Sequence, residues 1–450
     1  MLGIGGISMS GLAEVLLKEG FTVTGSDRGQ KELTTKLESE GARIEYTQTA
    51  ANVEKFPGVD VVVYTAAIHP DNPEFAAFAD AGVPMLTRAE LLGQIMSNYK
   101  HSIAISGTHG KTTVTSMIAH IMLAAGENPT ISVGGMLPII GGNIHIGSRD
   151  MFVTEACEYT NSFLKFYPTI GVILNIEADH LDFFKDINDI RNSFKEFVGT
   201  LPKDGSGTVV INSKIDNFKE IIEGFYGRVI TYGEFDGEVR AENIQYDSSA
   251  FASFDLIVNG EYVDRIQLRV PGRHNVDNAL AAISVAIKLG INPSVFKEGL
   301  ISFSGAERRF EKKGHLGDIV IFDDYAHHPQ EIEATLSAAE HYPHKRLVCV
   351  FQPHTYTRTK SLLNDFVKAL SLADQVIMPD IYAARETDTL GVSSKTVVDL
   401  INEKYPGKAH YIPSFGEVEN YLLANLEAGD MVITMGAGDV YLIGERLLGK

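Results

Sequence analysis

The residue types with the clearest chemical use lie at 106–113, which read Ser-Gly-Thr-His-Gly-Lys-Thr-Thr. In such a loop, glycines let backbone N–H groups approach phosphate oxygens, the lysine adds a positive charge, and a threonine hydroxyl can hold Mg²⁺. The apolar run at 103–105 predicts a strand before the loop, and the residues from Lys111 onward predict a helix after it. The alternative, an ordinary glycine turn, rarely carries Lys-Thr-Thr in this register. The segment therefore predicts a binding site for a nucleoside triphosphate.

The spacing of this loop differs from that of the common P-loop, which is G-x-x-x-x-G-K-[ST]. Gly107 stands only three residues before Gly110, and the position five residues before Gly110 is Ile105. The loop therefore indicates a triphosphate site outside the usual P-loop family.

A second glycine loop, Gly-Ile-Gly-Gly at 3–6, lies near the start of the chain, and Asp27 follows about twenty residues later. The pattern resembles a dinucleotide fingerprint, although Ser8 stands where a third glycine is usual. Such a loop turns a helix N-terminus toward a diphosphate and offers a carboxylate to a ribose or a base. A nucleoside diphosphate other than NAD fits equally well, and a plain tight turn is the remaining alternative. Only Met1 and Leu2 precede the loop, so we expect the first strand to be a stub.

Acidic residues and a histidine follow two predicted strands in the middle of the chain. Glu155 and Glu158 come after the apolar run at 151–154, and His180 comes shortly after the run at 170–175. Groups beyond the carboxyl ends of parallel strands meet at one rim of a sheet, where the phosphate loop is also expected. Oxygen ligands with an occasional histidine suit Mg²⁺ or Mn²⁺. The cluster therefore predicts a metal site near the nucleotide phosphates, with solvated loop residues as the alternative.

A third cluster accompanies two predicted strands of the C-terminal part. Arg308 and Arg309 precede the first of them, which ends in Asp-Asp-Tyr-Ala-His-His-Pro at 323–329. The second ends in Phe-Gln-Pro-His-Thr-Tyr-Thr-Arg at 351–358. If these strands are neighbours, their polar side chains meet at one edge of the sheet. Arginine suits a carboxylate and an acid or a histidine suits an amine, so the cluster predicts a pocket for a small zwitterion, with a surface of polar loops as the alternative.

Predicted strands and helices alternate along the whole chain, which is typical of α/β architecture. We expect three domains in series. Residues 1–98 predict a Rossmann-like domain, residues 99–303 a central P-loop-type domain with a mostly parallel sheet, and residues 304–450 a second Rossmann-like α/β domain. Within the central domain, the alternating stretch at 251–270 predicts a more antiparallel edge, and a helix is expected over 279–289.

The composition argues against several classes of function. The formal net charge is −19 and the isoelectric point is about 5.2. Binding to nucleic acid or to an anionic membrane needs a broad basic face, so neither is expected. We also expect no membrane insertion, since no run of about 18 apolar residues occurs. The two cysteines, Cys157 and Cys349, form neither a metal-binding spacing nor a disulfide framework, which indicates a reducing cytoplasm.

The motifs occur in a distinctive order: Gly-Ile-Gly-Gly-x-x-Met-Ser-Gly, Gly-Thr-His-Gly-Lys-Thr-Thr, Asp-His-Leu-Asp, Pro-Gly-Arg-His-Asn-x-x-Asn, Arg-Arg-Phe, Asp-Asp-Tyr-x-His-His-Pro and Phe-Gln-Pro-His-x-Tyr-x-Arg-Thr. Along essentially the whole chain this series resembles the Mur ligase family. The resemblance implies an ATP-dependent ligase of peptidoglycan synthesis. In that reaction ATP phosphorylates the carboxylate of UDP-N-acetylmuramate, and an amine then displaces the phosphate. Two stretches, 324–329 and 351–359, are most similar to the members that take L-alanine or a recycled peptide.

Two alternatives come from other classes of function. An NAD-dependent oxidoreductase would be built on residues 1–98, and a nucleotide-binding regulatory protein would use the phosphate loop without catalysis. For the ligase, the expected partners are the small molecules UDP-N-acetylmuramate and L-alanine, and the expected state is a monomer or a weak homodimer in the cytoplasm.

The resemblance also implies roles for single residues. Relatives often read Glu-Ala-Asp-Glu-Ser-Asp where this chain has Glu-Ala-Cys-Glu-Tyr-Thr at 155–160. Glu155 resembles the family's magnesium acid, but Glu158 is close enough to compete for that role. Thr65 stands where relatives often carry a serine near the uridine. The implied ATP contacts are Gly107, Thr108, His109, Gly110, Lys111, Thr112, Thr113, Asn275, Asn278, Arg309 and Asp324; the UDP-sugar contacts are Gly5, Gly6, Ser8, Asp27, Thr65 and His109; the amino-acid contacts are Tyr325, His327 and Arg358; the metal contacts are Thr112, Glu155 and His180; and the catalytic residues are Lys111, Glu155, His180, Arg309 and Asp324.

Overall fold

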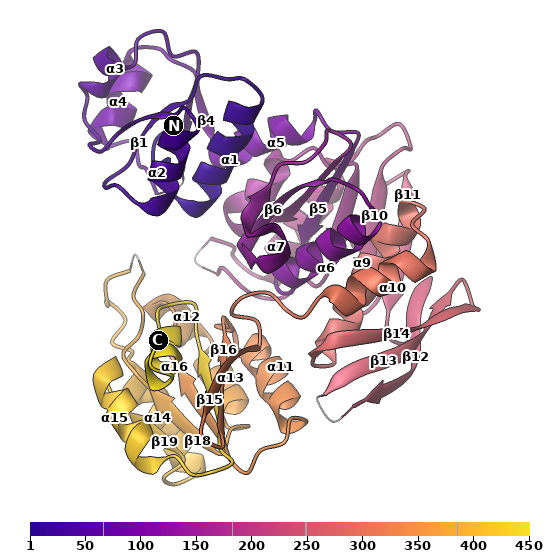
Figure 1. The fold of residues 1–450 in the computed structure, drawn as a ribbon, viewed down its shortest axis with the longest axis vertical. Coiled ribbons are helices and arrows are strands. Elements are labelled where there is room, and N and C mark those ends of the chain that lie inside the picture. The colour runs from indigo at the N-terminus through magenta and orange to yellow at the C-terminus, as the bar shows by residue number, and fades with distance from the viewer. Residues whose placement is uncertain (66, 182, 248–249, 385) are drawn as a thin grey trace. The chain divides into compact units, whose positions relative to one another are not determined.

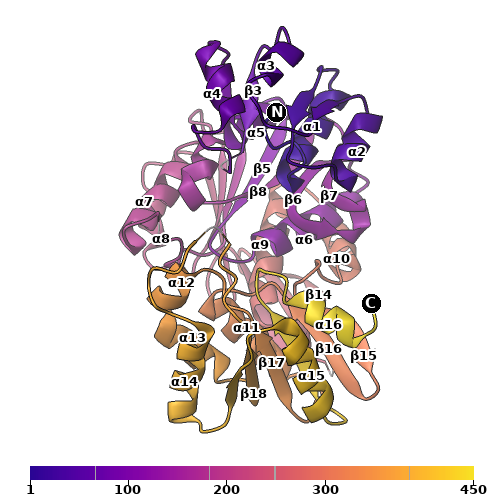
Figure 2. The same ribbon diagram turned by 90° about the vertical axis from the view of Figure 1, so that its left-hand side faces the viewer.

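The computed structural model describes residues 1–65, 67–181, 183–247, 250–384 and 386–450 (Figures 1 and 2). The chain divides into two compact units, and each is described by itself. The first comprises Met1–Ile176, Asn188–Ile211 and Ile215–Ile230, and the second comprises Glu177–Ile187, Asn212–Lys214 and Thr231–Lys450. The domain boundaries at 98/99 and 303/304 stay predictions. Among the described residues, none of the helices combines the length and the hydrophobicity that crossing a bilayer requires.

The N-terminal part of the first unit is a small parallel sheet with Leu2 at its centre. Leu2 makes parallel bridges to Ser26 on one side and Tyr64 on the other, which confirms the expected stub of a first strand. Strand β1 pairs with β2 and β3 pairs with β4, in both cases parallel. The elements are α1 (Ile7–Lys18), β1 (Thr24–Ser26), α2 (Glu32–Ser39), β2 (Arg43–Glu45), α3 (Asn52–Lys55), β3 (Val62–Tyr64), α4 (Pro73–Asp80), β4 (Met85–Thr87) and α5 (Arg88–Met96).

The rest of the first unit is built on a buried sheet in the order β10-β9-β5-β8-β6-β7. Every neighbouring pair is parallel except β6–β7, which is antiparallel. Its central strands are buried along almost their whole length, as expected for strands that are covered on both faces. The elements are β5 (His101–Ser106), α6 (Lys111–Ala124), β6 (Thr130–Leu137), β7 (Gly142–His145), β8 (Met151–Ala156), β9 (Ile170–Ile173), α7 (Ile187–Val198), β10 (Thr208–Asn212) and α8 (Phe218–Ile221), with 3₁₀ turns at Pro138–Ile140 and Tyr159–Lys165.

The second unit opens with long strands that carry the predicted antiparallel edge. After β11 (Arg228–Gly233), strands β12 (Val239–Tyr246), β13 (Phe251–Val258) and β14 (Glu261–Pro271) follow, and both the β12–β13 and the β13–β14 pairs are antiparallel. Two helices come next, α9 (His274–Lys288) and α10 (Pro293–Ser302). Helix α9 begins five residues before the predicted start at Ala279, so Asn275 and Asn278 lie in its first turns.

The C-terminal part of the second unit is a six-stranded sheet in the order β15-β16-β20-β17-β18-β19. The two strands that end near 323 and 351 are not neighbours, so the condition set for their cluster is wrong. Strand β20, from the end of the chain, lies between β16 and β17 and pairs with both. All three strands are parallel, so their carboxyl ends still share one edge. The elements are β15 (Glu311–Leu316), β16 (Ile319–Asp324), α11 (Pro329–Glu340), β17 (Leu347–Phe351), α12 (Tyr356–Ser361), α13 (Leu363–Leu370), β18 (Gln375–Met378), α14 (Ser394–Lys404), β19 (Ala409–Tyr411), α15 (Phe415–Asn425), β20 (Met431–Met435) and α16 (Tyr441–Leu447).

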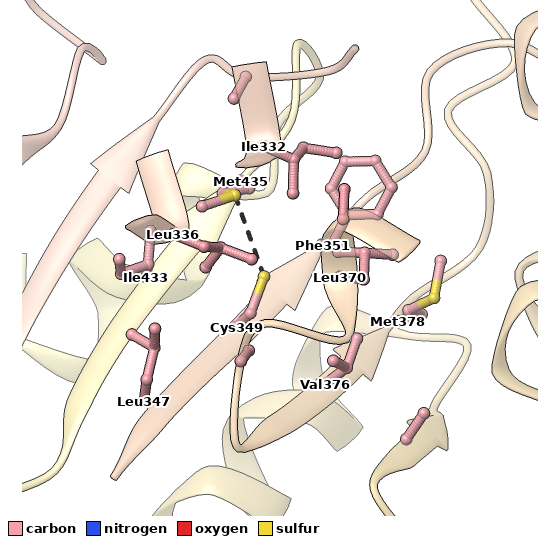
Figure 3. Close-up of a cluster of buried hydrophobic side chains, with 14 of the residues drawn as sticks. Ile332, Leu336, Leu347, Cys349, Phe351, Leu370, Val376, Met378, Ile433 and Met435 are labelled. Atoms are coloured by element: carbon pink, nitrogen blue, oxygen red, sulfur yellow. Dashed lines mark hydrogen bonds between the residues drawn. The ribbon is translucent and has the colours of Figure 1, made fainter. Parts of the chain in front are cut away.

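Helices cover both faces of this sheet. Helices α11, α13 and α14 lie on one side of the sheet and α15 and α16 on the other (Figure 2). The side chains of each set form a separate buried core with the sheet. The first of these cores surrounds Cys349, whose Sγ lies 4.0 Å from Sδ of Met435 (Figure 3). Burial raises the pKa of the Cys349 thiol well above its ordinary value, so this cysteine is an inert apolar side chain.

This core predicts a large difference between two leucine truncations. Leu336 is fully buried beside Cys349, so Leu336→Ala should lower the free energy of unfolding by about 2–5 kcal/mol through lost contacts and a cavity. Leu423 on α15 is 61% exposed, and Leu423→Ala should change the free energy of unfolding by less than about 0.5 kcal/mol. Chemical denaturation of the full chain measures both values. Equal effects of the two truncations would contradict the packing described here.

Candidate functional site

The phosphate loop joins β5 to α6 in a conformation that depends on its glycines. Gly107 has φ 141° and Gly110 has φ 84°. A Cβ atom on Gly107 would lie 2.9 Å from Cβ of Leu174. Asn175 then holds the loop from the end of β9, because its Oδ1 accepts the His109 N–H at 2.8 Å and its Nδ2 donates to the His109 carbonyl at 3.1 Å. The loop is therefore fixed in place with the N-terminus of α6 directly behind it.

Lys111, the first residue of α6, folds back over this loop. Its ammonium donates to the carbonyl oxygens of Gly107 and Thr108 and lies 3.1 Å from Oε2 of Glu158. Burial opposes the charge on Lys111, but the Glu158 carboxylate outweighs that cost, and the pKa of Lys111 is raised. Lys111 therefore keeps its positive charge at neutral pH, and Glu158 is its counterion.

Glu155 lies inside β8, opposite Ile105 of β5, and not beyond the end of the strand as the sequence predicted. Its Oε1 accepts the N–H of Gly134 on β6 at 2.6 Å. A Cβ on Gly134 would lie 2.9 Å from Oε2 of Glu155, and a Cβ on Gly135 would lie 3.5 Å from Cγ2 of Thr112. Thr112 and Glu155 therefore border the same two-glycine stretch of β6. A hydroxyl and a carboxylate at this place fit Mg²⁺, which prefers oxygen ligands.

The histidine of this prediction belongs to the second unit. His180 has φ 54° and donates its backbone N–H to Oδ1 of Asp179 at 2.7 Å. Asp182, which completes the Asp-His-Leu-Asp motif, lies outside the described residues. That His180 joins Thr112 and Glu155 at one metal stays a prediction.

Asp179 is bound to the arginine that sequence analysis assigned to the amino acid. Arg358 donates to Oδ1 of Asp179 from Nε at 3.3 Å and from Nη2 at 3.1 Å. Burial opposes the charge on Asp179, but the Arg358 guanidinium outweighs it and holds the pKa of Asp179 well below its usual range. The Nη1 atom of Arg358 lies 3.3 Å from Nδ1 of His354.

The predicted amino-acid residues come together at the carboxyl edge of the C-terminal sheet. The rings of Tyr325 and His327 meet edge to face at 5.4 Å, and the rings of His327 and His354 lie 5.8 Å apart. His327 is also held by Glu331, whose Oε2 accepts the His327 N–H at 3.0 Å. Since Arg358 contacts His354, one continuous group of side chains links the ends of β16 and β17.

Asp324 sits below this group and is already fully bonded within the chain. Its carboxylate accepts the N–H groups of Phe310 and Ala326, each at 2.7 Å, and the hydroxyl of Thr335 at 3.2 Å. Burial raises the pKa of Asp324 to about 6. Asp324 therefore anchors the turn before β15 and the turn after β16, whatever further contact it makes with a nucleotide.

The two adjacent arginines have different surroundings. Arg308 is committed to the fold, because it donates to Asp323 at 2.9 Å and to the carbonyl of Gly436 at 2.7 Å. Arg309 lies over the Tyr325 ring at 5.4 Å and makes only a loose pair with Glu331 at 3.7 Å. The geometry thus favours Arg309 as the arginine that can reach a phosphate.

Asn275 and Asn278 are buried in the first turns of α9 and bonded to each other. Nδ2 of Asn278 donates to Oδ1 of Asn275 at 2.9 Å, and Nδ2 of Asn275 donates to the carbonyl of Pro271 at 2.7 Å. A charged group that the sequence did not predict lies beside them, in which Lys214 contacts Glu234 at 3.2 Å and Asp277 at 2.8 Å. These side chains come from three separate segments, and nothing in their spacing marks them.

The N-terminal glycine loop brings together all of the predicted UDP-sugar residues except His109, which lies in the phosphate loop. The Gly5 N–H donates to Oδ2 of Asp27 at 2.9 Å, and a Cβ on Gly5 would lie 2.8 Å from that oxygen. A Cβ on Gly3 would lie 2.8 Å from Cγ2 of Thr65. Gly6 is the N-cap of α1, and Ser8 is exposed in its first turn. The loop, Asp27 and Thr65 thus form one surface at the N-terminus of α1.

Comparison with known proteins assigns this arrangement of loops and sheets. The profile of the Mur ligase family catalytic domain matches residues 1–100, that of the Mur ligase middle domain matches 105–286, and that of the Mur ligase glutamate ligase domain matches 308–438. The chain belongs to the Mur ligase family. The three-domain α/β fold of that family, with its mostly parallel central sheet, confirms the predicted fold class.

Individual Mur ligases match over almost the full length. The UDP-N-acetylmuramate–L-alanine ligase of Agathobacter rectalis is 56% identical, with 100% of this chain and 97% of that protein covered. The enzyme of the same name from Caldanaerobacter subterraneus is 49% identical, with 99% and 96% covered. Among solved structures, the UDP-N-acetylmuramate–alanine ligase of Thermotoga maritima has a TM-score of 0.81 at 28% identity, and the murein peptide ligase of Psychrobacter arcticus has 0.71 at 26%; both cover 100% of this chain and 97% of their own.

The largely enclosed His327 side chain predicts a pH dependence of stability. Burial lowers the pKa of His327 from 6.5 to about 4, so the unfolded chain binds the proton more tightly than the folded chain. The stability that neutral His327 contributes is present above pH 6.5 and is lost as the pH falls toward 4. Burial raises the pKa of Asp324 from 3.8 to about 6. Protonation of this carboxyl therefore increases the free energy of unfolding as the pH falls from 6 to 3.8, which opposes the effect of His327.

In His327→Gln, the free energy of unfolding should therefore fall by about 1–3 kcal/mol less between pH 6.5 and 4 than in the unmodified protein. Thermal unfolding at half-unit pH steps measures this slope. His315→Gln, at an exposed position on β15, is the matched control. A slope for His327→Gln that is as steep as that of the unmodified protein would contradict the buried neutral state of His327.

Proposed function

We propose that this protein is an ATP-dependent ligase that joins L-alanine to the carboxylate of UDP-N-acetylmuramate. The relatives that carry this name are 48–56% identical over nearly the whole chain. The observation that carries the proposal is the group formed by Tyr325, His327, His354 and Arg358, which is small, cationic and lined by rings. A small amino acid needs one cation for its carboxylate and limited space for its side chain.

The first half of the proposed reaction is a phosphoryl transfer. The γ-phosphate of ATP moves to the carboxylate of UDP-N-acetylmuramate, which turns a poor leaving group into phosphate. The loop N–H groups, with Lys111 above them, would bind and neutralise the triphosphate. Thr112, Glu155 and His180 are the residues proposed to hold Mg²⁺, which supplies further positive charge on the phosphates when it is bound. Asn275 and Asn278 are assigned to the adenine, and Arg309 and Asp324 to further contacts with ATP.

The second half is attack by the amine of L-alanine. The nitrogen bonds to the carbonyl carbon, the bond from that carbon to the phosphate oxygen breaks, and the ammonium proton is lost. Arg358 is assigned to the amino-acid carboxylate. His327 carries no charge at neutral pH, because burial lowers its pKa to about 4, so it does not repel the incoming amine. Tyr325 closes the pocket with its ring.

The glycine loop of residues 3–6 is assigned to the UDP moiety, together with Ser8, Asp27, Thr65 and His109. Asp27 already accepts the Gly5 N–H, so it would hold the loop open toward a diphosphate. We further propose that the protein acts as a monomer or a weak homodimer in the cytoplasm, where its two free cysteines would stay reduced.

Phosphate release across a panel of amines tests the function. With ATP, Mg²⁺ and UDP-N-acetylmuramate present, L-alanine should give the highest kcat/KM, above glycine and L-serine. Lys111→Ala should lower kcat/KM by at least about 100-fold, because a charge aimed at the phosphates is lost. No release with any amine would overturn the ligase.

The same panel includes a second candidate function. Murein peptide ligase structures match this fold with TM-scores up to 0.71, and one of those enzymes is named for L-alanyl-γ-D-glutamyl-meso-diaminopimelate. A higher kcat/KM with this tripeptide than with L-alanine would replace the alanine ligase by a peptide-recycling ligase.

Two isosteric variants separate the roles of the neighbouring acids. Glu155→Gln should raise the Mg²⁺ concentration for half-maximal activity by roughly ten-fold or more, because a charged ligand is lost. Glu158→Gln should leave the Mg²⁺ requirement near that of the unmodified protein and raise the KM for ATP, because Lys111 loses its counterion. Mg²⁺ titrations of both variants at saturating substrates measure this. The reverse pattern would move the metal to Glu158.

A further inference from the structure

Arg358, the arginine assigned to the amino acid, is covered by a carboxylate of the chain itself. The Asp179 and Arg358 side chains are only 9% and 12% exposed. Removing two such charges from water costs about as much as their attraction returns, so a buried pair of this kind is weak evidence for a stabilising role. The pair therefore calls for a functional explanation.

The contact uses only part of what a guanidinium offers to a carboxylate. Both Nε and Nη2 of Arg358 donate to one oxygen, Oδ1 of Asp179. The same oxygen also accepts the backbone N–H of His180 at 2.7 Å. The strongest arginine–carboxylate contact is a fork in which two N–H groups reach two different oxygens. A free carboxylate in the pocket can make that contact and can therefore compete with Asp179.

Arg358 is positioned by its own loop and not by Asp179. Thr355 opens α12 with φ 66° and ψ 148°, a strained conformation for a β-branched residue. Its N–H donates to the carbonyl of Tyr382 at 2.9 Å, and its hydroxyl accepts the Arg358 N–H at 3.4 Å. His354 lies against the guanidinium from the same loop. The cation would thus keep its place when Asp179 leaves.

Asp179, in contrast, stands on a segment of irregular backbone. The described residues between 177 and 186 form neither helix nor strand. Irregular backbone of this kind shifts at lower cost than a strand or a helix. Of the two partners, Asp179 is the one that can move.

We propose that Asp179 is an internal substitute for the carboxylate of the amino-acid substrate, which displaces it from Arg358. The inference rests on the proposed function, since the substrate class is an α-amino acid. The incoming carboxylate binds the guanidinium, and the Asp179 carboxylate moves away from it. The exchange sets a threshold for amino-acid binding and couples pocket occupancy to the position of His180.

The opposite role gives the opposite sign in an experiment. If Asp179 merely orients Arg358, its removal weakens amino-acid binding. If Asp179 competes with the substrate, its removal strengthens binding. Asp179→Asn, with saturating ATP and UDP-N-acetylmuramate, should lower the KM for L-alanine by roughly three- to ten-fold, the latter if nine-tenths of the molecules hold the pair closed. Asp186→Asn removes a carboxylate from the same segment and controls for charge. An unchanged or higher KM in Asp179→Asn overturns the proposal.

A binding measurement keeps the test independent of turnover. Thermal unfolding of Asp179→Asn is followed with sodium acetate, L-alanine and L-alaninamide, which keeps the ammonium and lacks the carboxylate. Acetate and L-alanine should raise the unfolding midpoint more in Asp179→Asn than in the unmodified protein, and L-alaninamide should not. The additional Arg358→Lys substitution should abolish the difference. The measurement with acetate does not require that the protein ligates an amino acid. A failure of the Asp179 proposal can therefore be distinguished from a failure of the proposed ligase function.

Asp179→Ser provides a second variant should the amide disturb folding, since its hydroxyl can accept the His180 N–H. It should give the same rise in midpoint with acetate and L-alanine. Equal midpoints in the unmodified protein and in both variants, at every acetate and L-alanine concentration, overturn the proposal.

Discussion

A cation that must later bind a phosphate or a carboxylate has to be kept charged while it is out of water, and the site of this protein depends on that constraint. Lys111 is buried over the phosphate loop, where desolvation alone would favour the neutral amine. The carboxylate of Glu158, 3.1 Å away, reverses that preference. The turn after β8 places Glu158 beside Lys111. The residue at which β8 ends therefore determines which of the two acids pairs with the lysine.

The order of strands explains why, within each unit, loops that are far apart in the sequence lie side by side. Parallel strands present their carboxyl ends at one edge, and β5 and β9 carry the phosphate loop and Asn175 to that edge. In the C-terminal sheet β16 and β17 do the same for Tyr325, His327 and His354, although β20 separates them. A spacer strand widens the edge by about 5 Å, and the rings and the arginine span that width.

Much of the fold and of the candidate site could be predicted from the sequence, because the informative residues are adjacent in the chain. The phosphate loop, the arginine pair and the two C-terminal motifs each lie within eight residues or so, and their chemistry is local. What the sequence could not supply depends on register and on distant segments. The difference between Glu155 and Glu158 follows from where β8 ends, and the separate roles of Arg308 and Arg309 follow from φ 56° at Arg308. The insertion of β20 depends on residues more than a hundred positions away.

Each unit contains one partly buried cation that is paired with a carboxylate, but the two pairs stand on different kinds of backbone. Lys111 is paired with Glu158 at the start of a 3₁₀ turn whose Phe163 is buried against the Phe194 and Phe197 rings of α7, so we expect that carboxylate to stay when phosphate binds. Arg358 is paired with Asp179 on an irregular segment, so that carboxylate can leave. A counterion that stays tunes a group, whereas a counterion that leaves competes with the ligand. The two ion pairs are equally short, so their length does not distinguish these two roles. The difference lies in the backbone segment that carries each acid.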